Sequence, residues 1–223
     1  MGRYVLLLVL LACGRDSSSA RTDSARTQAN GGAGPRPAAE LKTIVFLGTS
    51  LTAGLGLDPE DAFPMQIQHK VDSAGMPYEV VNAGVSGETS AGLLRRVEWL
   101  LQRPLDVVVI ETGANDGLRG VPVEAMASNL QRIIGRIRDA QPRTRVVLVQ
   151  MEAMPNMGSA YTVAFHDAFP ALAERNGIVL LPFLLDGVAG NRDLNQGDGI
   201  HPNEAGERIV AENVWRGLKP LLR

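Results

Sequence analysis

The chain has 223 residues, a hydrophobic fraction of 45% and a formal net charge of −2 at pH 7. This is enough apolar material for one sizeable core, and the length suits a single α/β domain. The charge gives no electrostatic basis for binding nucleic acid, and an aromatic content of 4% offers little stacking surface for bases. Cys13 is the only cysteine, and His69, His166 and His201 are widely separated, so the sequence predicts neither a zinc site nor an intrachain disulfide.

The first residues have the pattern of an export signal. Arg3 precedes an apolar run over 4–12, which is too short to span a bilayer because a transmembrane helix needs roughly 20 apolar residues. The end of the run, Leu-Leu-Ala-Cys at 10–13, resembles the lipobox of bacterial lipoproteins, whose cysteine is lipidated after cleavage. We expect residues 1–12 to be a lipoprotein-type signal peptide and Cys13 to anchor an exported protein in the cell envelope. A plain cleaved signal and a fortuitous apolar start are the alternatives.

Residues 13–40 predict a flexible linker. Between 14 and 40 there is no Val, Ile, Leu, Met, Phe, Tyr or Trp, so this segment cannot bury enough apolar area to offset its ordering entropy. The folded domain is therefore expected over 41–223.

From residue 41 onward, short apolar runs alternate with amphipathic stretches, which is typical of repeated βα units. The expected strands are 44–47, 78–81, 105–111, 145–150 and 178–181, and the expected helices are 64–73, 92–102, 122–140, 161–176 and 203–218. Right-handed crossovers between these units predict a three-layer α/β/α sandwich, flavodoxin-like, on a parallel sheet of about five strands.

Ser50 follows the first expected strand, in the stretch Gly-Thr-Ser at 48–50. Ligands bind outside the carboxyl ends of the strands in an open parallel sheet, so Ser50 is a candidate nucleophile. Its alternative role is to cap the following helix.

Asp198 and His201 lie just before the last expected helix. An Asp three residues before a His can fold back within one turn and accept the imidazole Nδ1–H, which fixes the tautomer needed for proton transfer. A surface turn with a capping Asp is the alternative.

Two further loops follow the second and third expected strands. Gly84 can bring its backbone N–H close to a bound group, and the Asn115 amide can donate into the same crevice. Both are also ordinary loop and turn residues. Taken together, the four stretches supply what serine acyl transfer requires: a nucleophile, a base, an orienting carboxylate and oxyanion donors.

The motifs Asn-Ala-Gly-Val-Ser-Gly at 82–87, Gly-Ala-Asn-Asp-Gly-Leu-Arg-Gly at 113–120 and Asp-Gly-Ile-His-Pro-Asn at 198–203 resemble those of the SGNH (GDSL) hydrolase family. The resemblance covers about residue 41 to the C-terminus. It points to the bacterial group of thioesterase I / protease I / lysophospholipase L1 and related arylesterases.

This resemblance implies Ser50 as nucleophile, Asp198 and His201 as the rest of the triad, and the N–H groups of Ser50 and Gly84 with the Asn115 amide as the oxyanion hole. It also implies that the loop over 151–160 lines an acyl pocket, to which Met154 and Met157 would give an adaptable apolar wall. No metal or cofactor is implied. One position departs from the family, which usually has Gly-Asp-Ser where this chain has Thr49.

We therefore expect an exported serine hydrolase of carboxylic esters and thioesters, arylesterase- or lysophospholipase-like, that works through an acyl-enzyme. Its expected substrates are lysophospholipids or short acyl esters, and its expected contact with a membrane is the anchor at Cys13. A carbohydrate O-acetyl esterase and a non-catalytic envelope lipoprotein with a decayed site are the alternatives. His69 and His166 are expected to be surface or packing residues.

Overall fold

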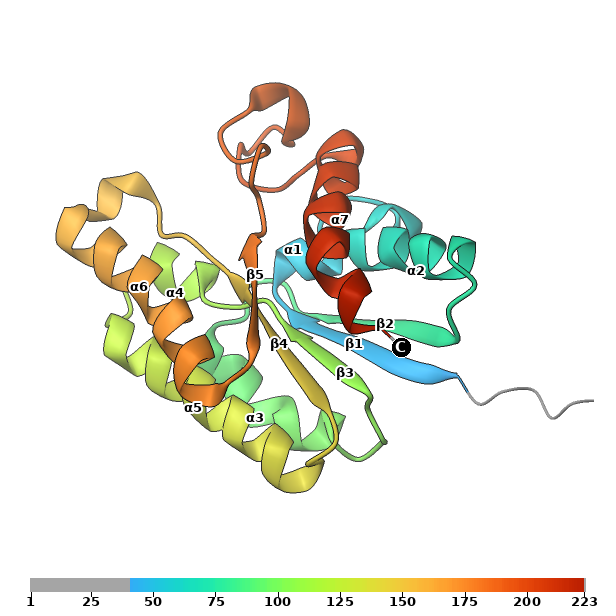
Figure 1. The fold of residues 1–223 in the computed structure, drawn as a ribbon. Helices are drawn as coiled ribbons and strands as arrows, with labels where there is room; N and C mark the ends of the chain where they lie inside the picture. The colour runs from blue at the N-terminus through green and yellow to red at the C-terminus, as the bar shows by residue number, and fades with distance from the viewer. Residues whose placement is uncertain (1–40, 223) are drawn as a thin grey trace, which may run out of the picture. The chain divides into compact units, whose positions relative to one another are not determined.

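The computed structural model describes residues 41–222, so the predicted signal peptide, the linker and Cys13 lie outside the described residues. Five strands form one parallel sheet in the order β2-β1-β3-β4-β5 (Figure 1). They are β1 (Lys42–Gly48), β2 (Tyr78–Gly84), β3 (Val107–Ile110), β4 (Arg145–Gln150) and β5 (Val179–Phe183). The predicted parallel sheet of five strands is confirmed.

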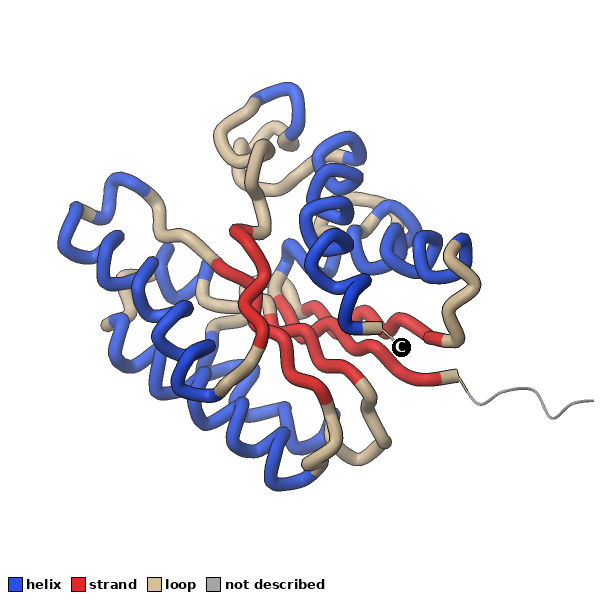
Figure 2. Tube along the Cα trace, viewed as in Figure 1, coloured by secondary structure: helices blue, strands red, loops and turns tan. Residues whose placement is uncertain are grey.

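Helices cover both faces of this sheet. One face carries α3 (Ser90–Leu100), α5 (Val123–Ala140) and α6 (Ser159–Asn176), and the other carries α2 (Phe63–Ser73) and α7 (Glu204–Leu218) (Figures 1 and 2). All four residues of β3 are buried, as the apolar run in the sequence indicates for a central strand. The predicted three-layer α/β/α sandwich is thus confirmed. Within 41–222, no helix combines the length and apolar character needed to cross a bilayer.

Two short helices, α1 (Ser50–Ala53) and α4 (Ala114–Leu118), were not predicted as elements. Strand β2 also runs three residues beyond its predicted end, because its backbone stays paired with β1 up to the pair Gly48 and Gly84. Backbone pairing continues there although the side chains are no longer apolar.

The strand order places a crevice at the carboxyl ends of β1 and β3. The chain leaves β1 toward β2 on one side, and β3 then adds to the other side of β1. Loops that leave adjacent strands in opposite directions open a ligand-binding crevice between them. Helix α1 follows β1 and helix α4 follows β3 at this point.

Candidate active site

Ser50, His201 and Asp198 form a continuous chain of hydrogen bonds. His201 Nε2 lies 2.8 Å from Ser50 Oγ, and His201 Nδ1 lies 2.6 Å from Asp198 Oδ2. The serine and the histidine are 151 residues apart in the sequence, so only the fold brings them together. Their geometry is that of a nucleophile next to a general base whose ring is oriented by a carboxylate.

The loop before α7 holds Asp198 in place through its own backbone. Asp198 Oδ1 accepts the N–H groups of Ile200 at 2.9 Å and His201 at 3.0 Å. The hydrogen bond from the His201 side chain, followed by these two backbone bonds, lowers the pKa of Asp198 to about 2. The carboxylate therefore stays ionised at neutral pH, as a group that stabilises an imidazolium must.

Helix α7 begins directly behind His201. Asn203 caps it, its Oδ1 accepting the N–H groups of Ala205 and Gly206, and Pro202 precedes the cap. The N–H of Gln196 donates to the His201 carbonyl at 2.7 Å, which ties the His201 loop back on itself. These local contacts fix the backbone that carries the imidazole.

Ser50 stands at the first position of α1, and Thr49 rather than Ser50 is its N-cap. The strand reaches this turn through Gly48, where a Cβ would fall 1.9 Å from Thr52 Oγ1 and 2.6 Å from Glu111 Oε2. A glycine is required there because the turn packs directly on a side chain beneath it.

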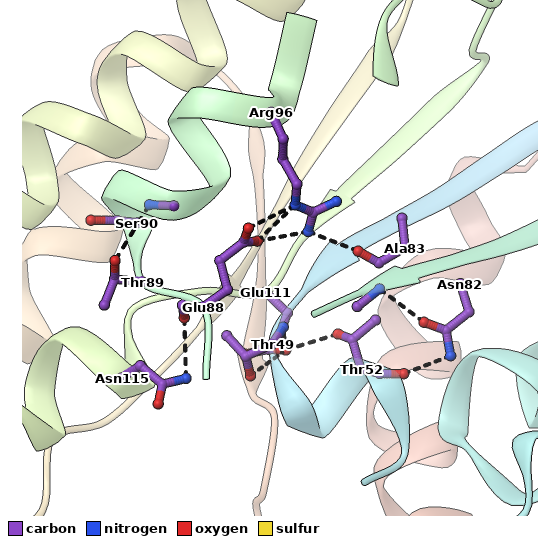
Figure 3. Close-up of polar contacts among 12 residues, drawn as sticks. Thr49, Thr52, Asn82, Ala83, Glu88, Thr89, Ser90, Arg96, Glu111 and Asn115 are labelled. Atoms are coloured by element: carbon purple, nitrogen blue, oxygen red, sulfur yellow. Dashed lines mark hydrogen bonds and ion pairs between the residues drawn. The ribbon is translucent and has the colours of Figure 1, made fainter. Parts of the chain in front are cut away.

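That side chain is Glu111, the residue after β3, which is fully buried. Its Oε2 accepts the Thr49 N–H at 2.9 Å and the Thr52 hydroxyl at 2.8 Å, and the Thr49 hydroxyl lies 3.1 Å from both carboxyl oxygens (Figure 3). These donors come from both sides of Ser50, so Glu111 fastens the turn that carries Ser50 to the central strand. Thr49, the position that departs from Gly-Asp-Ser, serves here as a hydrogen-bond donor to the carboxyl group.

Burial raises the pKa of Glu111 to about 7, against the opposing effect of these hydrogen bonds. A second buried carboxyl group, Glu207 of α7, accepts the Phe63 N–H at 2.8 Å, and burial together with the charge of Glu111 raises its pKa to about 8. Sequence reasoning missed both groups. The sequence held one indication for Glu111, namely a carboxylate directly after the continuous apolar run that forms β3.

The expected oxyanion donors are only partly in place. Asn115 Nδ2 donates to the Glu88 carbonyl at 3.1 Å, which leaves its second N–H for another acceptor. Gly84, by contrast, donates its N–H to Asn82 Oδ1 at 3.0 Å. It also packs so closely on α1 that a Cβ would fall 2.3 Å from the Ala53 nitrogen. This close packing on α1 explains why residue 84 is a glycine. The hydrogen bond of its N–H to Asn82 conflicts with the oxyanion-donor role expected for Gly84.

The loop between β2 and α3 is held in place by three side-chain contacts. Arg96 forms an ion pair with Glu88 at 2.7 Å and donates to the Ala83 carbonyl at 2.8 Å (Figure 3). Ser90 donates its hydroxyl to buried Asp116 at 2.6 Å. Ser90 therefore stabilises the loop.

An apolar cavity of about 390 Å³ opens beside the triad. Its walls include Leu51, Ala114 and Ile200, which directly adjoin Ser50, Asn115 and His201 in the chain. Met154 lines it as expected, but Met157 does not. A Cβ on Gly120 would lie 3.5 Å from Met157 Cε, which places the Met157 side chain against that glycine instead.

Glu152 brings a charge to the cavity wall. Its Oε1 is hydrogen-bonded to His166 Nδ1 at 2.7 Å, so His166, an exposed residue as expected, contacts the cavity's edge. His69 lies 3.9 Å from exposed Glu60, which is compatible with a surface role. Among residues 41–222, no cluster of three or more His, Cys, Asp or Glu side chains could hold a metal ion.

The five-stranded sandwich and the Ser–His–Asp chain at its carboxyl edge define a class of α/β proteins equipped for nucleophilic catalysis. Residues 46–209 match the model of the GDSL-like Lipase/Acylhydrolase family, and the chain belongs to this family.

Its relatives carry the names of ester-cleaving enzymes. Esterase TesA of Pseudomonas aeruginosa is 40% identical over 186 residues, 82% of this chain and 91% of that protein. Thioesterase 1/protease 1/lysophospholipase L1 of Escherichia coli K12 is 34% identical, over 83% of this chain and 87% of that protein. The psychrotrophic esterase EstA of Pseudoalteromonas, solved as inhibited by monoethylphosphonate, aligns with a TM-score of 0.77 and 35% identity. That alignment covers 81% of this chain and 98% of EstA.

Proposed function

We propose that this protein is a serine esterase and thioesterase that hydrolyses acyl esters through an acyl-enzyme formed on Ser50. The observation that carries the proposal is the 2.8 Å contact between Ser50 Oγ and His201 Nε2, with Asp198 oriented on the opposite ring nitrogen. The names of the relatives support ester and thioester substrates.

In the proposed reaction, Ser50 Oγ attacks the acyl carbonyl carbon while His201 Nε2 takes its proton. Ionised Asp198 stabilises the imidazolium that forms. His201 then donates this proton to the leaving alkoxide or thiolate, which releases the first product. A water molecule, activated by His201 in the same way, attacks the acyl-enzyme and frees the acid.

The oxyanion is held by backbone and amide donors. Ser50, at the first position of α1, has a backbone N–H that no helical carbonyl accepts, and Asn115 has its second amide N–H. For the remaining donor we assign Gly87 in place of Gly84. Gly87 has a φ of +77°, lies next to the carbonyl that anchors Asn115, and its N–H has no protein acceptor among residues 41–222.

The apolar cavity supports an acyl chain as the part of the substrate that is bound. A volume of about 390 Å³ beside Ser50 exceeds the needs of an acetyl group, which favours acyl esters, including lysophospholipids, over acetylated carbohydrates. The intact hydrogen-bond chain at Ser50 argues against a decayed site.

Replacing Ser50 with Ala tests the assignment. Turnover of p-nitrophenyl octanoate is expected to fall by at least about 10³-fold, because no other group forms the acyl-enzyme. A fluorophosphonate probe is expected to label the wild-type protein at Ser50 and to leave the variant unlabelled.

Ser73→Ala is the matched control, since Ser73 is an exposed serine at the end of α2, away from the triad, and it should keep both turnover and labelling. Turnover that survives in Ser50→Ala would reject the assignment. A preference for acetylated glycans over octanoyl esters in the wild-type protein would instead favour the O-acetyl esterase.

A further inference from the structure

A second hollow borders the active site on the side of the loop between β2 and α3. Its volume is about 440 Å³, and its walls are residues 85–89, Gly92 and the side chains of Arg95, Arg96 and Arg119. We call it the arginine groove. Glu88, whose carbonyl anchors Asn115, belongs to its wall, while Ala114, on the other side of Asn115 in the chain, lines the acyl cavity. The two hollows therefore flank the same amide.

The groove carries an excess of positive charge. Glu88 neutralises Arg96, with Nε–O distances of 2.8 and 3.0 Å and an Nη2–O distance of 2.7 Å. Arg119 donates only to the Gly87 carbonyl, at 3.0 Å, and exposed Arg95 donates to no acceptor among residues 41–222. Within the described part of the chain, two guanidinium groups in the groove thus lack a carboxylate partner.

The acyl chain and the alcohol part of an ester extend from its carbonyl carbon in different directions. If the acyl half occupies the apolar cavity, the alcohol half must lie elsewhere, and the arginine groove is the neighbouring hollow that reaches Asn115 through Glu88. Guanidinium groups bind phosphate oxygens through paired N–H donors, which suits them to a phosphate a few bonds from the ester.

We propose that the arginine groove binds the leaving-group half of the substrate and selects alcohols that carry a phosphate group. This inference rests on the proposed function and adds a specificity site to it. Arg95 and Arg119 supply the recognition, while Arg96 serves to hold the loop through Glu88.

The test compares two substrates with the same acyl chain, octanoyl lysophosphatidylglycerol and 1-octanoylglycerol, each kept below its micellar concentration. The ratio of their kcat/KM values is expected to fall about two- to five-fold in Arg95→Gln or Arg119→Gln, and about ten-fold in the double variant. In the wild-type protein, the same ratio should fall as ionic strength rises, because salt screens exposed charges.

Arg132→Gln, at an exposed arginine of α5 outside the groove, is the matched control and should keep the wild-type ratio. An unchanged ratio in the double variant, or an equal fall in Arg132→Gln, would overturn the proposal. An effect that appears only on vesicles of anionic lipid would do the same, because it would assign the arginines to a membrane surface.

Turnover of p-nitrophenyl octanoate separates this proposal from the proposed function. If that turnover depends on Ser50 but the ratio of kcat/KM values stays unchanged when Arg95 and Arg119 are replaced, only the groove assignment fails. If that turnover survives in Ser50→Ala, the proposed function fails first.

Discussion

At the scale of single residues, the two carboxylate oxygens of Asp198 accept hydrogen bonds from different groups. Oδ1 binds the backbone of its own loop, and Oδ2 binds the imidazole. An amide in its place could serve the backbone through its oxygen but would offer N–H groups to His201. The imidazole would then accept at Nδ1 and carry its proton on Nε2, where it could not take the proton of Ser50.

Asp198→Asn is therefore expected to lower kcat by about 10³-fold while KM and the melting temperature stay close to wild type. Steady-state kinetics with p-nitrophenyl octanoate, paired with thermal unfolding, measures both. A kcat within ten-fold of wild type in a folded variant would contradict the role of this carboxylate.

Thr52 belongs to the turn that carries Ser50 and connects it to Glu111 beneath. Its hydroxyl donates to the buried carboxyl group at 2.8 Å, and its carbonyl accepts from Asn82 at 2.7 Å. Thr52→Val keeps the shape of the side chain but takes a hydrogen-bond donor from a buried carboxyl group. The free energy of unfolding is expected to fall by about 1–3 kcal/mol, as measured by urea denaturation.

Thr52→Ser is the control, since it keeps the hydroxyl and should lose less stability than Thr52→Val. A loss of stability in Thr52→Ser with none in Thr52→Val would show that the methyl group, and not the hydrogen bond, matters at this position.

At the scale of elements, Glu207 ties α7 to the start of α2 through the Phe63 N–H. Its pKa is about 8 in the folded protein against an ordinary value of 4.5, so between these pH values the folded state holds a proton that the unfolded state has lost. The contribution of Glu207 to stability is therefore complete below pH 4.5 and is lost as pH rises through 8. Glu111, with a pKa of about 7, acts in the same direction.

Glu207→Gln keeps an oxygen acceptor for Phe63 and removes the titrating group. The melting temperature of this variant is expected to fall less between pH 5 and pH 9 than that of the wild-type protein. Glu212→Gln, at an exposed position of the same helix, should keep the wild-type slope. An identical pH dependence in Glu207→Gln and the wild-type protein would refute the linkage.

At the scale of the whole molecule, the domain over 41–222 carries the candidate active site, and the predicted anchor at Cys13 is expected to hold this domain at the cell envelope. The anchor stays a prediction, because residues 1–40 lie outside the described residues. We propose that a lipid on Cys13 tethers the enzyme to the cell envelope and brings it near lysophospholipid substrates. A single lipid chain gives only reversible binding, so a stable anchor requires more than one.

Expression of the full chain in a bacterial host tests this proposal. Cys13→Ser is expected to move the protein from the membrane fraction to the soluble fraction, and mass spectrometry should find lipid on Cys13 only in the wild-type protein. Ser17→Ala, in the predicted linker, is the control. A wild-type protein without lipid would exclude the anchor.

The sequence alone predicted the sandwich, the chain order of its strands and helices, and the pairing of Asp198 with His201. Strands and helices follow from the local alternation of apolar and polar residues, and Asp198 meets His201 across three positions of one turn. Patterns of this kind join residues that are close in the sequence, so they can be recognised without a structure.

Only the tertiary structure decided how the site is supported. Thr49 and Glu111 are 62 residues apart, and Glu207 lies 144 residues from Phe63, so neither buried carboxyl group could be paired with its donors by spacing. The same holds for Gly84, whose N–H is already used, and for Met157, which misses the cavity. Whether a polar group is buried, and which donor meets it, depends on how distant segments pack, and the local sequence does not contain that information.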